Sequence, residues 1–361
     1  MEYLFQYLTF LAQTATIVVA VLVVVAGLVT LSMRRQQQTA GHLEIRKLNE
    51  FYADLKLDVQ SAMLPASAMR KMRRKAQKAM DAAAKKAARE AARTGGTASE
   101  PSAGRRRTVF VLDFHGDLQA NQVRDLRTEI SAVLSGAQPG DEVVVRLESP
   151  GGMVHGYGLA ASQLDRIRQH EIPLTVTVDK VAASGGYLMA AVADRIVAAP
   201  FAIVGSIGVV AQVPNVHRLL KRHDVDVDVI TAGKFKRTLT VFGENTEEGR
   251  RKFVEELDEL HQLFQDYIVE RRPAIDVEKV ATGESWHGQH ALSLNLVDEL
   301  CTSDEYLLRL SDEADIYEVR WVEHRKPLER LMAQVESSMA RSTETALGRW
   351  VEKLSQWRGG I

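Results

Sequence analysis

The regular alternation of short apolar runs with helical stretches from Thr108 onward limits the fold more than any other feature of this sequence. Each run ends at Gly, Pro or Asp, as in "EVVVRLESPGG", and is followed by residues at helical spacing, as in "GYGLAASQLDRIRQH". Strands and helices that take turns in this way form a largely parallel sheet with crossover helices. We therefore expect an α/β domain over residues 108–322, with its chemistry where strands end and loops lead into helices.

The N-terminal segment is apolar and carries no charged residue from Tyr3 to Met33. It is longer than the roughly 20 residues that cross a hydrocarbon core. A cleaved signal peptide is the alternative, but the only early charge is Glu2 and the apolar run is too long for one. We therefore expect a single transmembrane anchor over residues 1–33.

The next segment, residues 34–107, is strongly basic. It holds 18 Lys and Arg against 7 Asp and Glu, whereas the whole chain has 46 against 47. Apolar residues at helical spacing over 48–63 predict an amphipathic helix, which could pack on a neighbouring helix or lie on lipid. The rest predicts a basic helix that gives way to a flexible linker. Its place after an anchor favours lipid headgroups, and the lack of interleaved aromatic residues argues against nucleic acid.

Three glycine-rich corners follow successive predicted strands: "ESPGG" at 148–152, "ASGG" at 183–186 and "VGSIGV" at 204–209. One such corner alone indicates only a tight turn. Three together fit a serine hydrolase, which needs a nucleophile at a helix start and backbone N–H groups open to an oxyanion. Ser184 is the candidate nucleophile. Ser149, the competing serine, precedes a proline and is interpreted as a turn residue.

The base for this serine is not a nearby histidine, because none occurs between His170 and His217. Past a later strand end, "ITAGKFKRTLT" places Lys234 and Lys236 instead. A lysine can act as a base if burial keeps its amine neutral. Lysines on a surface loop are the alternative interpretation, and the spacing alone leaves it open.

The motifs "SPGG", "ASGGY", "VGSIGV", "GKFKRT" and "ATGESWHGQHALSLNLVDEL" resemble, in order and spacing, those of the signal peptide peptidase A family over about residues 108–305. That family comprises membrane-bound serine peptidases with a serine-lysine dyad on a ClpP/crotonase-like fold. The resemblance implies that Ser184 is the nucleophile, that Lys236 is the base and that Ser206 hydrogen-bonds the lysine. Arg237, next to that base, would be an awkward neighbour if it pointed inward.

The resemblance also implies the groups that hold the oxyanion, namely the backbone N–H groups of Gly152 and Gly185, with Gly151 left open. In the last motif, structural roles are expected for Trp286, Gly288, Gln289 and Asp298. Cys301 is the only cysteine, which excludes an intrachain disulfide and a thiolate metal cluster. The chemistry requires no metal and no organic cofactor.

Apolar residues at helical intervals predict an amphipathic helix in the C-terminal segment, residues 323–361. It could cover the domain's own core, another subunit or lipid. Since members of the family assemble into rings or domes, we expect a homo-oligomer.

The expected function is that of a serine endopeptidase anchored in a bacterial inner (plasma) membrane. Its substrates would be remnants of signal peptides or other membrane-associated, unfolded polypeptides. Two alternatives stay open, a crotonase-like acyl-CoA enzyme, which needs neither serine nor lysine, and an inactive membrane scaffold. The side of the membrane also stays open, because the basic residues after the anchor favour the cytoplasm whereas the resemblance favours the periplasm.

Overall fold

The fold is described by a computed structural model over residues 41–63, 78, 82 and 105–323, and residues 44–321 form one compact unit. The anchor expected over residues 1–33 lies outside the described residues, as do most of the linker and the helix expected beyond Glu323. Within the described ranges, no helix combines the length and the apolar character that a membrane span requires.

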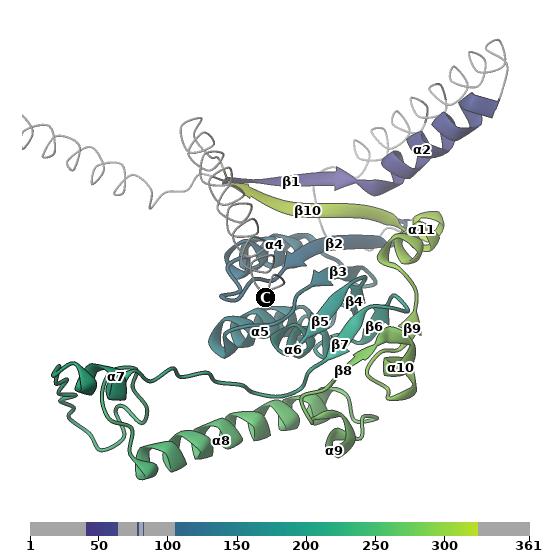
Figure 1. The fold of residues 1–361 in the computed structure, drawn as a ribbon. Helices are drawn as coiled ribbons and strands as arrows, with labels where there is room; N and C mark the ends of the chain where they lie inside the picture. Colours follow the sequence, from purple (N-terminus) through teal and green to yellow (C-terminus); the bar gives the residue numbers. More distant parts are fainter. Residues whose placement is uncertain (1–40, 64–77, 79–81, 83–104, 324–361) are drawn as a thin grey trace, which may run out of the picture. The chain divides into compact units, whose positions relative to one another are not determined.

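The main sheet of the described chain has seven strands in the order β1-β10-β2-β3-β4-β6-β9 (Figure 1). These strands are β1 (Gly41–Lys47), β2 (Thr108–His115), β3 (Glu142–Glu148), β4 (Leu174–Val178), β6 (Arg195–Ala198), β9 (Glu299–Leu300) and β10 (Asp315–Glu323). All pairings from β10 to β9 are parallel, so the predicted α/β class with a parallel sheet is confirmed. A smaller sheet joins β5 (Val181–Ala183), β7 (Ile203–Gly205) and β8 (Ser285–His287).

Helices lie on both faces of the main sheet (Figure 1). The helices of the described chain are α2 (Leu48–Met63), α4 (Val123–Gly136), α5 (Val154–Gln169), α6 (Gly185–Ala190), α7 (His217–Arg222), α8 (Glu247–Arg271), α9 (Val277–Val280), α10 (Gly288–Ser293) and α11 (Ser303–Glu313). Along β2, Val109 and Val111 pack with α11 and the start of α2, whereas Phe114 meets Tyr157 of α5. Alternate residues of one strand therefore supply both halves of the core. In β4 all five residues are buried, as expected for a central strand of such a sheet.

The segment before residue 108 contributes more than a linker. The helix predicted over 48–63 is α2, and Leu48 at its start is buried in the core cluster. The preceding residues form β1, which adds an edge strand beside β10. The periodicity of residues 48–63 predicts the helix. The sequence of β1 itself predicts no strand, because its residues are mostly exposed and include no buried apolar run.

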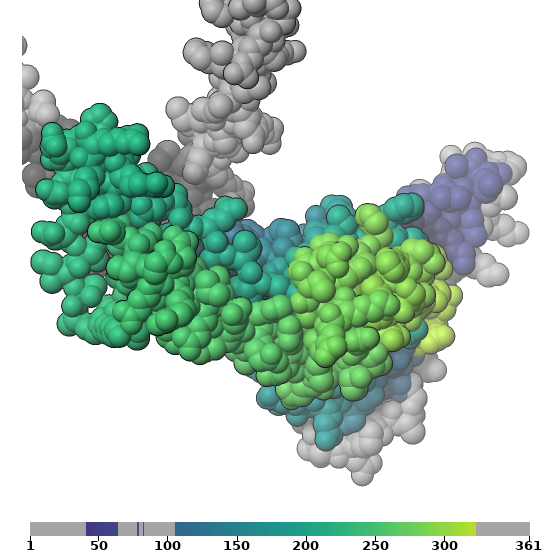
Figure 2. Space-filling model, turned by 60° about the horizontal axis from the view of Figure 1, so that its bottom comes forward, coloured from purple at the N-terminus to yellow at the C-terminus, as the bar shows by residue number. Residues whose placement is uncertain are grey.

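One part of the unit extends away from the sheet: residues 208–246, which include α7, together with α8. We call it the arm (Figures 1 and 2). Between residues 208 and 246 only Gly243 is buried, and of the 25 residues of α8 only Gly249 and Ile268 are buried. The arm therefore has almost no core of its own within this chain. Most of its side chains are left for solvent or for another molecule.

Candidate active site

The three glycine-rich corners meet at one place, beyond the C-terminal ends of β3, β5 and β7. Ala183 N donates to Ser149 O over 3.0 Å, and Ser184 N donates to Gly205 O over 2.8 Å. A Cβ added to Gly151 would lie 2.8 Å from Gly185 N. The expectation that these corners belong together is therefore met in space, and the turns pack too closely for larger residues.

Ser184 occupies a strained turn between β5 and α6. Its φ of 52° and ψ of −119° are unusual for a residue with a Cβ, and such backbone costs about 1–3 kcal/mol that the surrounding contacts must hold. The side chain is partly exposed and makes no capping hydrogen bond. The hydroxyl is thus presented at the corner rather than used in folding.

Among the backbone N–H groups beside Ser184, those of Gly152 and Gly185 have no acceptor within the described residues. The N–H of Gly151, the alternative that the sequence left open, donates to Ser149 Oγ over 3.1 Å. Close packing explains the glycines. A Cβ on Gly152 would lie 2.3 Å from Leu118 O, and one on Gly185 would lie 2.4 Å from the ring of Tyr157.

Ser149 is fully buried, and its hydroxyl lies 2.6 Å from the hydroxyl of Tyr157, so it is not exposed to a substrate. Ser206 follows β7 at a φ of 50° and is partly exposed. Its N–H donates to Glu284 O over 2.6 Å. Gly205, the residue before it, has a φ of 98° and packs against the ring of Trp286.

Residues of the last motif make hydrogen bonds and an ion pair within the domain, which fits the structural roles expected for them. Gly288 N donates to Ala202 O over 2.8 Å, and Gln289 N donates to Pro200 O over 3.0 Å. The carboxylate of Asp298 accepts from Ile196 N over 2.7 Å and also pairs with Arg272. These bonds attach the C-terminal part of the domain to β6 and β7, the strands beside the site.

Lys236, the predicted base, lies in the arm between α7 and α8, where it is exposed. Its N–H donates to Gly233 O over 3.2 Å, and its amine has no partner among the described residues. Lys234 pairs with Glu248 over 2.7 Å, and Arg237 is exposed beside them. Within one chain, therefore, the catalytic lysine implied by the sequence is not brought to Ser184.

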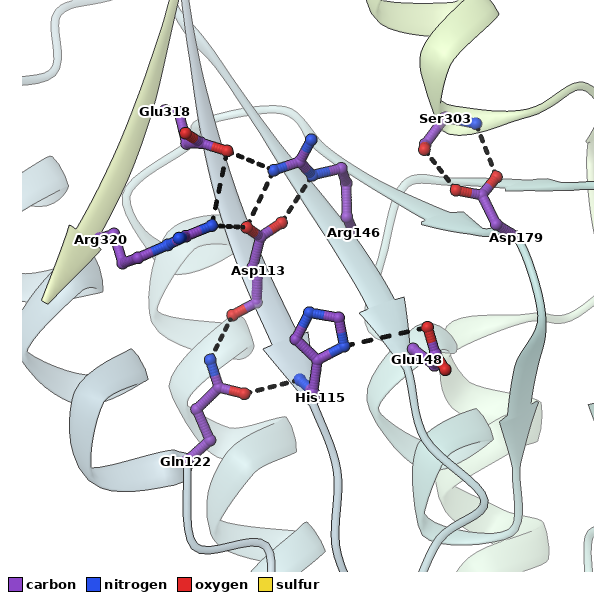
Figure 3. A network of polar contacts seen from close by, with 9 residues as sticks. All are labelled: Asp113, His115, Gln122, Arg146, Glu148, Asp179, Ser303, Glu318 and Arg320. Atoms are coloured by element: carbon purple, nitrogen blue, oxygen red, sulfur yellow. Dashed lines mark hydrogen bonds and ion pairs between the residues drawn. The ribbon is translucent and has the colours of Figure 1, made fainter. Parts of the chain in front are cut away.

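A cluster of charges that sequence reasoning missed lies on one face of the main sheet, on β2, β3 and β10 (Figure 3). Asp113 accepts from Arg146 over 2.6 Å and from Arg320 over 2.8 Å, and Glu318 also contacts both guanidinium groups. Burial would raise the pKa of Asp113, but the two arginines outweigh it and hold the pKa below its ordinary value. Because every charge is paired, the cluster joins strands and offers no free acid or base.

A signal for this cluster was present in the sequence, since Asp113 and Arg146 interrupt otherwise apolar strands. They are direct neighbours in the register of β2 and β3. Figure 3 also shows Asp179 accepting from the N–H and the hydroxyl of Ser303, the first residue of α11. Among the described residues, no group of three or more His, Cys, Asp and Glu side chains is arranged to hold a metal ion.

A strained serine at a strand-to-helix corner, beside two unpartnered N–H groups, defines the class of acyl-transfer serine hydrolases. The sequence agrees at the level of the family. Residues 2–164 match the family model "Peptidase family S49 N-terminal", and residues 166–317 match "Peptidase family S49". The chain belongs to peptidase family S49 and is a serine peptidase.

Within that family the chain is similar to proteins named "Probable protease SohB". The one from Haemophilus influenzae is 49% identical over 92% of this chain and 93% of its own length. The one from Buchnera aphidicola subsp. Acyrthosiphon pisum is 53% identical over 65% of this chain and 70% of its own length. A solved structure of the 1510-N membrane-bound stomatin-specific protease with a substrate peptide is 12% identical, covers 64% of this chain and 98% of that one, and has a TM-score of 0.40.

Proposed function

We propose that this peptidase is a membrane-anchored endopeptidase that uses Ser184 as nucleophile and Lys236 as base. The proposal rests mainly on one observation: the turns that carry the free N–H groups of Gly152 and Gly185 pack beside Ser184. Membership of a peptidase family favours this reading over a crotonase-like acyl-CoA enzyme and over an inactive scaffold.

The proposed reaction is acyl transfer in two halves. The neutral amine of Lys236 takes the proton of Ser184 as Oγ attacks a peptide carbonyl, and the N–H groups of Gly152 and Gly185 bind the resulting oxyanion. The lysine then gives its proton to the leaving amine, and an acyl-enzyme remains. Water, deprotonated by the same lysine, releases the product and restores the serine. Ser206 would orient the amine by a hydrogen bond.

This mechanism requires an amine beside Ser184, and we propose that it comes from the arm of a second copy. The arm exposes large apolar side chains, namely Val210, Leu219, Ile230, Phe242, Val254 and Leu263. Exposed apolar side chains that gather on one element are typical of an interaction site. An arm that lies on a neighbouring copy would bury these side chains and desolvate the lysine, which lowers the pKa of an amine toward the range of a useful base.

The test is complementation between two inactive variants, Ser184→Ala and Lys236→Met, coexpressed with different tags and purified as mixed assemblies. If the lysine acts across the interface, roughly a quarter of the sites in a random mixture hold both groups, and activity on a peptide substrate returns to that fraction. If both groups come from one chain, no mixed site is complete and activity stays absent. Wild-type activity in either single variant would refute the dyad.

The anchor over residues 1–33 and the basic residues after it favour a place at the inner membrane of a bacterium, in contact with anionic lipid. The substrates we propose are signal-peptide remnants and unfolded segments of membrane-associated polypeptides. Protease accessibility in right-side-out vesicles identifies the side on which the catalytic domain lies. Digestion of the domain from outside assigns it to the periplasm, and protection until lysis assigns it to the cytoplasm.

A further inference from the structure

A chain of hydrogen bonds lies behind the Gly151 turn and takes no part in the proposed mechanism. The N–H of Gly151 donates to Ser149 Oγ over 3.1 Å, and that oxygen lies 2.6 Å from the hydroxyl of Tyr157. Tyr157 in turn donates to Asp117 O over 2.8 Å. A phenol has one proton, so Tyr157 uses it on Asp117 and Ser149 must donate to Tyr157. Each group thus has a defined partner, and each bond strengthens the next.

This series of hydrogen bonds begins at the Gly151 turn, which carries one of the two proposed oxyanion donors, the N–H of Gly152. Gly151 has a φ of 87°, a conformation that glycine can leave easily. Rotation of the peptide between Gly151 and Gly152 would turn the N–H of Gly152 away from Ser184. The peptide groups on either side are held in place by two bonds, from Gly151 N to Ser149 Oγ and from Met153 N to Leu118 O, the latter over 2.8 Å, so the ends of this turn cannot follow such a rotation.

The other end of this series of hydrogen bonds, at Asp117, is held in place by further bonds. The carboxylate of Asp117 accepts from the backbone N–H of Gln119 over 3.1 Å and of Asn121 over 2.9 Å, and from the Asn121 amide over 2.8 Å. The loop that offers Asp117 O to Tyr157 is therefore held in one conformation. Through Tyr157 and Ser149 this loop determines the position of the glycine turn.

The ring of Tyr157 reaches the second donor as well. It packs directly behind Gly185, where a Cβ would lie 2.4 Å from the ring, and Phe114 holds it in an edge-on contact with centroids 6.4 Å apart. One fully buried side chain therefore contacts both segments that present free N–H groups. Burial raises the pKa of Tyr157, which keeps the phenol protonated at neutral pH.

We infer that Tyr157, acting through Ser149, is a positioning residue that sets the distance and direction of the two oxyanion donors. The inference rests on the proposed role of Gly152 and Gly185. Neither Tyr157 nor Ser149 touches the substrate. Their contribution is to hold the donors in place before the oxyanion forms.

The test is the kinetics of Tyr157→Phe, which keeps the ring and removes only the hydroxyl. The kcat falls about 10–100-fold while KM changes less than about 3-fold, because a misplaced donor weakens the transition state more than the bound substrate. Inhibition by a peptide aldehyde, whose adduct with Ser184 places an oxyanion in the same site, weakens by a factor similar to the loss of kcat. Ser149→Ala gives the same pattern, and the double variant adds little further loss.

The matched control is Tyr306→Phe. Tyr306 of α11 is also a buried tyrosine whose hydroxyl makes hydrogen bonds, to Glu142 and Thr175. These partners lie at the N-terminal ends of β3 and β4, whereas the proposed active site lies at the C-terminal ends of strands. Its loss lowers the melting temperature without lowering kcat. If Tyr157→Phe behaves like this control, or if its aldehyde affinity is unchanged, the inference is wrong. If Ser184→Ala keeps wild-type activity, the proposed function fails instead, whatever the tyrosine variants do.

Discussion

At the scale of single residues, the site depends on backbone that few amino acids tolerate. Ser184 and Ser206 hold positive φ, and Gly151 and Gly205 do so beside them. These residues lie within a few ångströms of one another and share bonds, so each turn holds the next. Two of the strained residues, Ser184 and Ser206, therefore lie where the proposed mechanism needs a hydroxyl and two N–H groups to face one point.

Glu129 shows a different kind of strain, a buried carboxyl with too few partners. One oxygen accepts from Trp321 N over 2.7 Å, and the other has no partner in the described structure. Burial, with the charges of Asp125 and Asp113, raises the pKa of Glu129 to about 7, against the opposing effect of that bond and of Arg320. The native state thus binds a proton that the unfolded chain releases near pH 4.5.

This raised pKa predicts a stability that falls as the pH rises. The contribution of the neutral carboxyl is fully present below the unfolded pKa and is lost as the pH passes about 7. Glu129→Gln cannot ionise. The free energy of unfolding of this variant, relative to that of the wild type, should therefore increase by up to about 3 kcal/mol between pH 4.5 and pH 8. Urea titrations at both pH values measure the difference. A gap that does not change with pH would show that Glu129 is ionised in the native state or is solvated.

At the scale of elements, β10 is joined to the central strands by charge as well as by its backbone. Its pairing with β2 covers Asp315 to Glu318, and beyond that point Arg320 reaches Asp113 of β2. Arg146 of β3 completes the link. The cluster therefore holds the end of β10 that lies beyond its backbone pairing with β2.

Asp113→Asn should loosen this end of β10. The loss at pH 7 is on the order of 1–3 kcal/mol, because two arginines then share one acidic partner. The pKa of Asp113 is below its ordinary value, so its contribution is present above the unfolded pKa and is lost as the pH falls through the folded one. Hydrogen exchange along β10 and unfolding at pH 7 and pH 3 test both parts. Equal stability at pH 7, or a gap that widens in acid, would contradict the prediction.

At the scale of the whole molecule, the arm is the part of the described chain with the fewest buried side chains, although the C-terminal end of α8 pairs with Asp165 of α5 through Arg271. Ile230 is 94% exposed, and Leu263, on α8, is 64% exposed. Single exposed apolar residues are common on soluble proteins, but the arm carries many of them on one element. Their exposure is consistent with the proposal that the arm is an assembly surface between copies.

Ile230→Asp should disrupt that assembly, since an unpaired charge in an apolar interface is strongly unfavourable. We expect a lower mass by light scattering, and a loss of activity that follows the loss of assembly. Leu308→Asp is the matched control, because Leu308 is 48% exposed on α11, outside the arm. An Ile230→Asp variant that keeps both the mass and the activity of the wild type would exclude the arm as the interface.

The sequence by itself determined the parts of this protein that depend on local patterns. Alternating apolar runs specify strands and helices, and glycines at three strand ends specify tight turns, because both preferences act over a few residues. The α/β class, the corner at Ser184 and the helix over 48–63 follow from these patterns. The common edge of a parallel sheet then brings the three corners together.

Only the tertiary structure decided the features that join distant residues. The N–H of Gly151 is occupied because Ser149 folds back toward Tyr157, and Asp113 is paired because three strands align their charges. The family resemblance implies Lys236 as the base for Ser184, yet Lys236 lies in an exposed arm. Spacing along a chain says nothing of the direction in which an unburied segment runs, because that direction is set by contacts with surfaces far away in the sequence or on another copy.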